Sequence, residues 1–133
     1  MKKTVHVVGA VIENEQQQIL CAQRSATMSL ANLWEFPGGK IEQQETPQQA
    51  LKREIMEELS CTIDVFNQVA DVTHEYENVI VRLETYMAKV VADEPIASEH
   101  AQIRWLRREE MPALQWAEAD IPTLHKLIQK EGD

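Results

Sequence analysis

Apolar and polar residues alternate along several short stretches of this chain, which predicts strands. Residues 4–13 are apolar on both alternating faces, as expected of a central strand that is covered on both sides. The polar residues 14–17 follow it, and residues 18–24 form a second apolar stretch, so a hairpin between these two strands is expected. Residues 71–78 are polar and are expected to form a loop. The other predicted strands are residues 62–70, 79–91 and 103–106.

Residues 47–59 have the spacing of an amphipathic helix. Thr46 provides a hydroxyl for the N-cap, Pro47 suits the first helical position, and Gln49 completes a capping box. Nothing within the segment breaks a helix, and most of its residues favour one. The apolar stripe that would face the core consists of Leu51, Ile55 and Leu59.

A second amphipathic helix is predicted for residues 121–130, with Asp120 at its N-cap. Strands that alternate with two helices favour an α/β (α+β) fold in which a mixed sheet lies between helices. With 133 residues and no linker or internal repeat, the chain is expected to form a single domain over residues 1–133.

Five glutamates are concentrated in the first predicted helix and in the loop before it. Glu54, Glu57 and Glu58 are spaced so that they lie on one helical face beside the apolar stripe. Like charges at this spacing destabilise an isolated helix by about 0.2–0.5 kcal/mol per pair. Two interpretations are open, a solvated acidic face or a site for a compensating cation. The glutamates of the loop are Glu42 and Glu45.

The acidic composition limits which partners the chain can bind. Its net charge of −9 argues against a general nucleic-acid-binding protein, because phosphate contacts require clustered lysine and arginine. An acidic protein that binds an anionic nucleotide would therefore need metal ions as mediators. Cys21 and Cys61 are far apart in the sequence and indicate neither a disulfide scaffold nor a zinc site. No apolar run approaches the ~18 residues that span a membrane, and a cytoplasmic protein is expected.

The spacing of residues around the glutamates resembles a known motif. Gly39 is followed after five residues by Glu45 and, after seven more, by the run 53–58, REIMEE. This pattern, which extends to Cys61, resembles the Nudix box, and the chain is similar to the Nudix hydrolases and, within them, to the MutT-like nucleoside triphosphate pyrophosphohydrolases. The preceding run 33–40, LWEFPGGK, resembles the lead-in of that family. The resemblance implies the Nudix-type α/β/α sandwich.

Two positions at the ends of the box bear on its local geometry. Ser60 stands just past the helix, where the family usually has glycine. Glycine favours the left-handed conformation that ends many helices, so serine is expected to cost about 1 kcal/mol there. At the other end, residues 37–39, Pro-Gly-Gly, are expected to turn sharply and to let backbone carbonyls approach a ligand or an ion closely.

The resemblance also implies a divalent metal site. Hydrolysis of a triphosphate at neutral pH requires neutralised phosphate oxygens and an activated water, and divalent ions supply both. Mg²⁺, or Mn²⁺ in its place, prefers oxygen ligands. In the family, the glutamates of the helix bind the metals together with a backbone carbonyl and a glutamate of a later loop. The expected ligands here are the Gly38 carbonyl, Glu54, Glu57, Glu58 and Glu99.

The general base has two candidates. Glu54 is the first, because it lies in the middle of the acidic cluster, where like charges and a metal act on it most strongly. Glu99 is the second, since a residue on a mobile loop could meet a water beside the substrate, and Glu94 is close enough in sequence to compete with it. The resemblance further places Arg53 with the catalytic residues and implies that Arg53 and Glu45 brace the loop onto the helix.

The residues that would choose the nucleotide lie outside the box. The ending, residues 105–122, resembles MutT-like enzymes that act on cytidine nucleotides and oxidised guanine nucleotides, in which a polar residue at the position of Asp120 hydrogen-bonds the base. A plain N-cap is the alternative for Asp120. Arg24 matches a family position near the nucleotide, and Phe36 is either a wall of the base pocket or a core residue. The residues expected to contact the substrate are Arg24, Phe36, Gly39, Lys40 and Asp120.

Three functions fit these features. The first is sanitation of the nucleotide pool, in which 8-oxo-dGTP is cut to the monophosphate and pyrophosphate and oxidised guanine is kept out of DNA. The second is the same reaction on CTP, dCTP or modified pyrimidine nucleotides. The third is a catalytically silent nucleotide-binding module that regulates a partner, and the intact carboxylate cluster argues against it. The expected partner is a small nucleoside triphosphate, with no nucleic-acid polymer and no membrane, and a monomer or weak dimer is expected.

Overall fold

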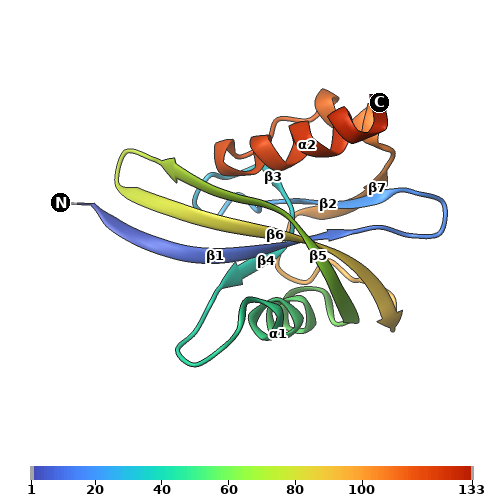
Figure 1. The fold of residues 1–133 in the computed structure, drawn as a ribbon, viewed down its shortest axis with the longest axis horizontal. Coiled ribbons are helices and arrows are strands. Elements are labelled where there is room, and N and C mark those ends of the chain that lie inside the picture. Colours follow the sequence, from blue (N-terminus) through green and yellow to red (C-terminus); the bar gives the residue numbers. More distant parts are fainter. Residues whose placement is uncertain (1, 133) are drawn as a thin grey trace.

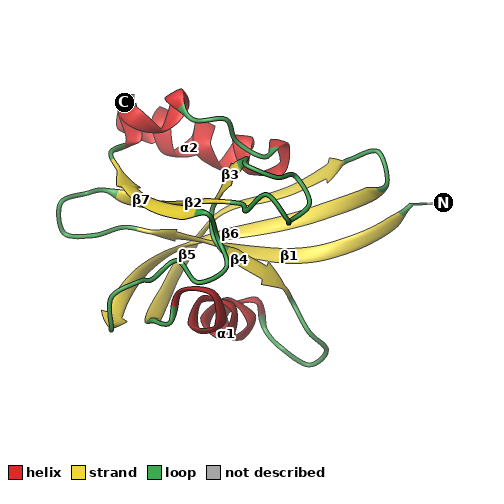
Figure 2. Ribbon diagram, turned by 180° about the vertical axis from the view of Figure 1, so that it is seen from behind, coloured by secondary structure: helices red, strands yellow, loops and turns green. Residues whose placement is uncertain are grey.

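The computed structural model describes residues 2–132 and arranges them in layers (Figure 1). Helix α1, Pro47–Leu59, lies on one side of the strands, and helix α2, Ile121–Gly132, lies on the other. Figure 2 shows the same order of layers from behind. The predicted α/β/α arrangement around a mixed sheet is therefore confirmed.

The larger sheet has its strands in the order β4-β1-β6-β5. β1 runs parallel to β6, whereas the β1–β4 and β5–β6 pairs are antiparallel, so the sheet is mixed. The strands are β1 (Lys3–Ile12), β4 (Gly38–Lys40), β5 (Thr62–Glu75) and β6 (Val79–Ala92).

A smaller antiparallel sheet has β2 at its centre, in the order β3-β2-β7. Its strands are β2 (Ile19–Gln23), β3 (Trp34–Glu35) and β7 (Gln102–Leu106). Two short 3₁₀ helices, η1 (Arg108–Ala113) and η2 (Glu118–Asp120), lead from β7 to α2.

The predicted hairpin between the first two strands is wrong. Glu13 and Ile19 form an isolated bridge, and the Asn14 N–H donates to the Gln18 carbonyl oxygen at 3.0 Å, but β1 and β2 then enter different sheets. One edge of β1 pairs with β6 over residues 3–12, and the other pairs with β4 over residues 7–9. Consecutive strands usually lie next to each other in a sheet. β1 and β2 are an exception, because β1 pairs with β4 and β6 instead.

The loop predicted for residues 71–78 is wrong over most of its length. β5 continues to Glu75, and residues 71–75 pair with β6. The register shifts between Val65 and Ala70, which marks bulges within the strand. β5 is an edge strand whose backbone pairs with the long strand β6, and most of its polar side chains are exposed.

Of the sharp turn predicted at residues 37–39, the structure has only a bend at Pro37, between β3 and β4. Gly38 and Gly39 form part of β4 and pair with Gly9 and Val8 of β1. None of the glycines in the described chain has a positive φ. Gly38 is required for close approach instead, because a Cβ at this position would overlap the Val8 carbonyl oxygen.

Helix α1 has the predicted bounds and the predicted cap. The Thr46 hydroxyl accepts a hydrogen bond from the Gln49 N–H at 3.1 Å, and Gln49 Oε1 accepts one from the Thr46 N–H at 2.9 Å, which completes the capping box. At the other end, Ser60 adopts the left-handed conformation with a φ of 57°, and its N–H donates to the Met56 carbonyl oxygen. Serine therefore occupies the strained position that the family pattern reserves for glycine.

Two groups of buried apolar residues hold the layers together. One joins the apolar stripe of α1 to β1 and β6, and the other joins α2 to β2 and β3. Trp34 and Trp116, for which the sequence leaves core and pocket open, are 5% and 7% exposed and belong to the second group. Cys21 and Cys61 are buried free thiols. Within residues 2–132, no helix is long and apolar enough to cross a membrane.

Replacing Ser60 by glycine is expected to stabilise the protein by about 0.5–1 kcal/mol, because glycine adopts the left-handed conformation without a Cβ clash. The free energy of unfolding in urea measures this change. The matched control is Met56→Gly at an exposed position inside the same helix, which should destabilise the protein by about 1 kcal/mol. Equal losses of stability for Ser60→Gly and Met56→Gly would contradict the strain at Ser60.

Candidate active site

Arg53 organises the glutamates of the box. Its Nε and Nη2 donate to the two carboxylate oxygens of Glu45 at 2.7 and 3.0 Å, and its Nη1 donates to Glu54 and to Glu57, each at 3.0 Å. Nη2 also donates to the Lys40 carbonyl oxygen at 3.0 Å. The hydrogen bonds with Glu45, more than any other contact, raise the Arg53 pKa above its usual value. The guanidinium thus fastens β4 and the following loop to α1.

The carboxylate of Glu54 rests against Gly39 of β4. A Cβ on Gly39 would overlap the carboxylate carbon and both of its oxygens. The Glu54 side chain is 17% exposed and is held from the other direction by Arg53. Gly39 therefore makes the space that this carboxylate occupies.

Glu58 is the carboxylate with the least complete hydrogen bonding. Its Oε1 is buried and has no partner within the described part of the chain. Burial, followed by the charges of Glu35, Glu54 and Glu99, raises the pKa of Glu58 to about 9, while a hydrogen bond with the Gly38 backbone acts in the opposite direction. At neutral pH this side chain therefore holds a proton that a bound cation would displace.

Glu99 lies in the loop between β6 and β7, which is fastened to α1. The Ser98 hydroxyl donates to the Glu58 carbonyl oxygen at 2.6 Å. Glu99 itself is exposed, and its charge contributes to the raised pKa of Glu58. Glu94, its competitor in the sequence, lines a separate hollow of about 600 Å³ and is not among the charges that act on Glu58. The structure thus brings Glu99 to the helix glutamates.

These residues offer oxygen donors that suit a hard divalent cation. Among residues 2–132, no three His, Cys, Asp or Glu side chains already converge as a metal site, and Glu54 and Glu57 both accept hydrogen bonds from Arg53. Mg²⁺ usually binds through one or two carboxylates, and waters and substrate phosphates complete its shell, so a full protein cage is not required. The buried, unpartnered oxygen of Glu58 is the observation that fits such an ion.

Asp120 is buried and its side chain reaches β3. Its Oδ1 accepts a hydrogen bond from the Phe36 N–H at 3.0 Å, across 84 positions of the sequence, and no described hydrogen bond joins it to the first turn of α2. The plain N-cap is therefore not supported. Burial, and then the charge of Glu35, raises the pKa of Asp120 well above its usual range. The Phe36 ring lies in the core against Trp116, with ring centroids 4.9 Å apart.

Arg24 is engaged within the protein. Its Nη1 donates to Glu35 Oε1 at 2.7 Å, and its Nε and Nη2 donate to the carbonyl and hydroxyl oxygens of Ser29. Its predicted contact with a base edge or a phosphate would have to be made alongside these bonds. The backbone of Lys40 contacts Arg53, and Lys40 is exposed.

Sequence reasoning did not single out Glu35 and His100. Glu35 Oε2 lies 2.8 Å from His100 Nε2. The His100 side chain is fully buried, and its Nδ1 has no hydrogen-bond partner among the described residues. The charge of Glu35 raises the pKa of both Glu58 and Asp120, so it acts on both sides of the site. The sequence feature that could have indicated Glu35 is an acidic residue inside the otherwise apolar run 33–37.

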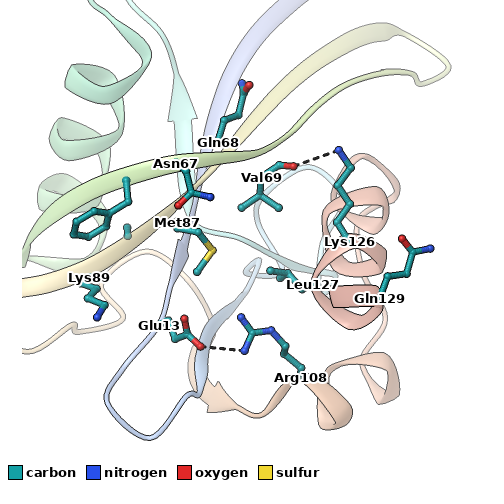
Figure 3. A pocket seen from close by; sticks show the side chains of 12 residues that line it. Glu13, Asn67, Gln68, Val69, Met87, Lys89, Arg108, Lys126, Leu127 and Gln129 are labelled. Atoms are coloured by element: carbon teal, nitrogen blue, oxygen red, sulfur yellow. Dashed lines mark hydrogen bonds and ion pairs between the residues drawn. The ribbon is translucent and has the colours of Figure 1, made fainter. Parts of the chain in front are cut away.

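A hollow of about 740 Å³ lies away from these residues (Figure 3). Parts of β5, β6 and α2 form its walls, including Phe66, Met87 and Lys126. None of the predicted site residues lines it. The carboxylates therefore locate the candidate active site better than cavity volume does.

Known proteins resemble this chain over almost its whole length. The model of the NUDIX domain matches residues 7–126. A CTP pyrophosphohydrolase of Escherichia coli strain K12 is 39% identical over 126 residues, which cover 95% of this chain and 93% of that protein. An 8-oxo-dGTP diphosphatase of Haemophilus influenzae is 32% identical over 129 residues, covering 97% and 95%. The solution structure of the DNA mismatch repair protein MutT from methicillin resistant Staphylococcus aureus 252 is 48% identical, with a TM-score of 0.78, and covers 98% of this chain and 99% of that one. Together with the Arg53-braced glutamates on α1, these similarities show that the chain belongs to the Nudix hydrolase family.

Proposed function

We propose that this chain hydrolyses a nucleoside triphosphate to the monophosphate and pyrophosphate with Mg²⁺, which Mn²⁺ can replace. Nudix hydrolases depend on divalent metals. The observation that carries the proposal is the buried oxygen of Glu58, which has no hydrogen-bond partner among residues 2–132 and lies in the field of neighbouring carboxylates. Such a group costs free energy unless a cation compensates it. The proposed ligands are the Gly38 carbonyl, Glu54, Glu57, Glu58 and Glu99.

The protein residues position the reaction. When bound, the divalent ion would neutralise phosphate oxygens and make a water more acidic. Arg53 orients Glu54 and Glu57, and Glu45 orients Arg53 by a bidentate contact. Gly39 leaves room for the Glu54 carboxylate. The exposed side chain of Lys40, on the strand end beside Arg53, is a proposed phosphate contact.

Glu54 is the proposed general base. Its carboxylate is held between Gly39 and Arg53, which fixes the direction in which it can accept a proton. Glu99 is the alternative, because its exposed side chain on the loop could reach a water on the other side of the substrate. A general base must lie within hydrogen-bond reach of the proton it takes. The charges of Glu54 and Glu99 both act on Glu58, so both candidates lie near it.

We propose that Asp120, held in place by the Phe36 N–H, reads the base. Burial raises the pKa of Asp120, which favours the protonated carboxyl, and a protonated carboxyl offers one donor and one acceptor. The N7–O6 edge of guanine offers two acceptors, whereas its 8-oxo form carries a hydrogen on N7 and so offers a donor beside an acceptor. Cytosine offers a comparable pair, its amino group beside N3. This chemistry supports 8-oxo-dGTP over dGTP and keeps CTP and dCTP as the alternative.

The names of the relatives support both substrates. The Haemophilus relative is an 8-oxo-dGTP diphosphatase and the Escherichia coli relative is a CTP pyrophosphohydrolase. Sanitation of 8-oxo-dGTP is the proposed role, carried out in the cytoplasm by a monomer or weak dimer without a nucleic-acid polymer or a membrane as partner. Because the net charge is −9, an anionic nucleotide would need metal ions to mediate its binding.

The proposed function is tested by a panel of nucleoside triphosphates with Mg²⁺, scored by kcat/KM. 8-oxo-dGTP is expected to exceed dGTP by about tenfold or more, since one mismatched donor or acceptor in a buried site costs about 1–3 kcal/mol. Equal or better values for CTP, dCTP or 5-methyl-dCTP would favour the pyrimidine reading. If the protein bound nucleotides but turned over none of them, the proposed enzyme activity would be wrong and a catalytically silent module would be favoured.

Glu54→Gln and Glu99→Gln separate the two candidate bases. The variant that lacks the base is expected to lose about 10²- to 10⁴-fold in kcat with little change in KM, because a proton acceptor is removed and the volume is kept. We expect this loss for Glu54→Gln and a smaller one for Glu99→Gln. Normal turnover by both variants would show that the proposed site is wrong.

Alanine at Gly39 and at Gly38 should act differently. At Gly39 the new Cβ meets only the end of a side chain, so the fold should persist while Glu54 is displaced and kcat falls about tenfold or more. At Gly38 the Cβ meets the backbone of β1, and a loss of about 1–3 kcal/mol of stability is expected. Urea unfolding and steady-state kinetics on both variants measure this, and wild-type kcat in a folded Gly39→Ala protein would contradict the contact with Glu54.

A further inference from the structure

Three polar side chains in contact, two partly buried and one fully buried, connect the second sheet to the loop that carries Glu99. Glu35 of β3 accepts a hydrogen bond from Arg24 on Oε1, at 2.7 Å, and contacts His100 Nε2 through Oε2, at 2.8 Å. The exposed fractions of the side chains are 19% for Arg24, 14% for Glu35 and 0% for His100. Both carboxylate oxygens of Glu35 are therefore committed to fixed partners.

His100 directly follows Glu99, and the chain is fastened on both sides of Glu99. Before it, the Ser98 hydroxyl donates to the Glu58 carbonyl oxygen at 2.6 Å. After it, His100 contacts Glu35, and the Ala101 N–H donates to the Gln23 carbonyl oxygen at 2.9 Å. One anchor lies on α1 and the other on the second sheet, while the Glu99 side chain between them is exposed.

In this arrangement, the residues on either side of Glu99 set the direction of its side chain. An exposed glutamate on a loop has many rotamers and a mobile backbone, and only fixed flanking residues restrict where its carboxylate points. The Ser98 anchor alone would let the chain rotate about the preceding bonds. The second anchor depends on His100, because the imidazole is the part of this stretch that is completely enclosed.

We infer that His100, held by Glu35, is a positioning residue that aims the Glu99 carboxylate at the glutamates of α1. Arg24 contributes to the same positioning indirectly, because it fixes Glu35. The inference rests on the proposed function, in which Glu99 contributes to the metal site. It also gives Arg24 a role inside the protein in place of direct contact with the nucleotide.

The variants are chosen to separate the hydrogen bond from the volume. His100→Leu removes the donor and keeps an apolar side chain in the enclosed space, whereas His100→Gln retains an N–H at a similar reach for Glu35. Arg108→Met is the matched control, because it breaks a comparably buried ion pair, that of Arg108 with Glu13 at 3.0 Å, whose residues line the hollow away from the site. Each change is also made in a Glu99→Gln background.

His100→Leu is expected to lower kcat by up to about 10²-fold, the loss typical of a catalytic group misplaced by about 1 Å, and by no more than Glu99→Gln does, with little change in KM. His100→Gln should restore most of the loss, and Arg108→Met should leave kcat unchanged. In the Glu99→Gln background, His100→Leu should cost less than about threefold more, because it acts through a carboxylate that is already gone. Losses that multiply in the double variant, or equal losses for leucine and glutamine, would overturn the inference.

Hydrogen exchange of the metal-free protein provides a readout that does not need turnover. The Ala101 amide should exchange faster in His100→Leu, at least tenfold, and at the wild-type rate in His100→Gln and Arg108→Met. Unchanged exchange in His100→Leu would overturn the positioning role even if kcat fell. If the wild-type protein turned over no nucleotide, the proposed function would fail, and the exchange result would still decide whether His100 anchors the loop.

Discussion

The site depends on holding several carboxylates close together before a cation is present. Arg53 does this by donating to Glu45, Glu54 and Glu57 at once, so that one guanidinium offsets the repulsion within the box. A lysine could not replace it, because a single ammonium cannot bind one carboxylate in bidentate fashion and still reach two others in fixed directions. The same contacts require β4 to lie next to α1, because Arg53 of α1 binds Lys40 at the end of β4 and Glu45 in the loop that follows.

Two local features are unfavourable for stability, and one of them, at Glu58, belongs to the candidate site. Glu58 buries a carboxylate oxygen without a partner, and Ser60 takes a left-handed backbone that suits glycine. Both lie at the C-terminal end of α1, whose apolar stripe packs in a core without exposed surface. Burial of a leucine or isoleucine contributes about 1.5–3 kcal/mol, so the three residues of the stripe offset these costs within the same helix. Because strain persists only where surrounding packing fixes the structure, the rigid helix end is a suitable place for it.

The parts of the fold that were predictable from sequence are those decided by local interactions. The bounds of α1 followed from Thr46, Pro47 and Gln49, whose hydrogen bonds and dihedral preferences act within one turn. The pairing of β1 with β6 and the extension of β5 to Glu75 depend on residues distant in the sequence, and the expected hairpin and loop were wrong there. The box identified the carboxylates, since its spacing is regular, but Glu35 and His100 were not found. A buried acid and a buried histidine 65 residues apart have no common pattern until the sheet and the loop are built.

The short segment of β3 and Phe36 links the two halves of the site. Glu35 contacts His100 through its side chain, and the next residue offers its backbone N–H to Asp120. Two consecutive residues therefore hold both the loop of Glu99 and the buried carboxyl of Asp120. Under the proposed function, the Nudix box carries the reaction, while Glu35 and Phe36 hold two residues that the substrate would meet, Glu99 and Asp120. A substitution that shifted the Phe36 backbone would then also move Glu35, and we expect it to change the base preference and the position of Glu99 together.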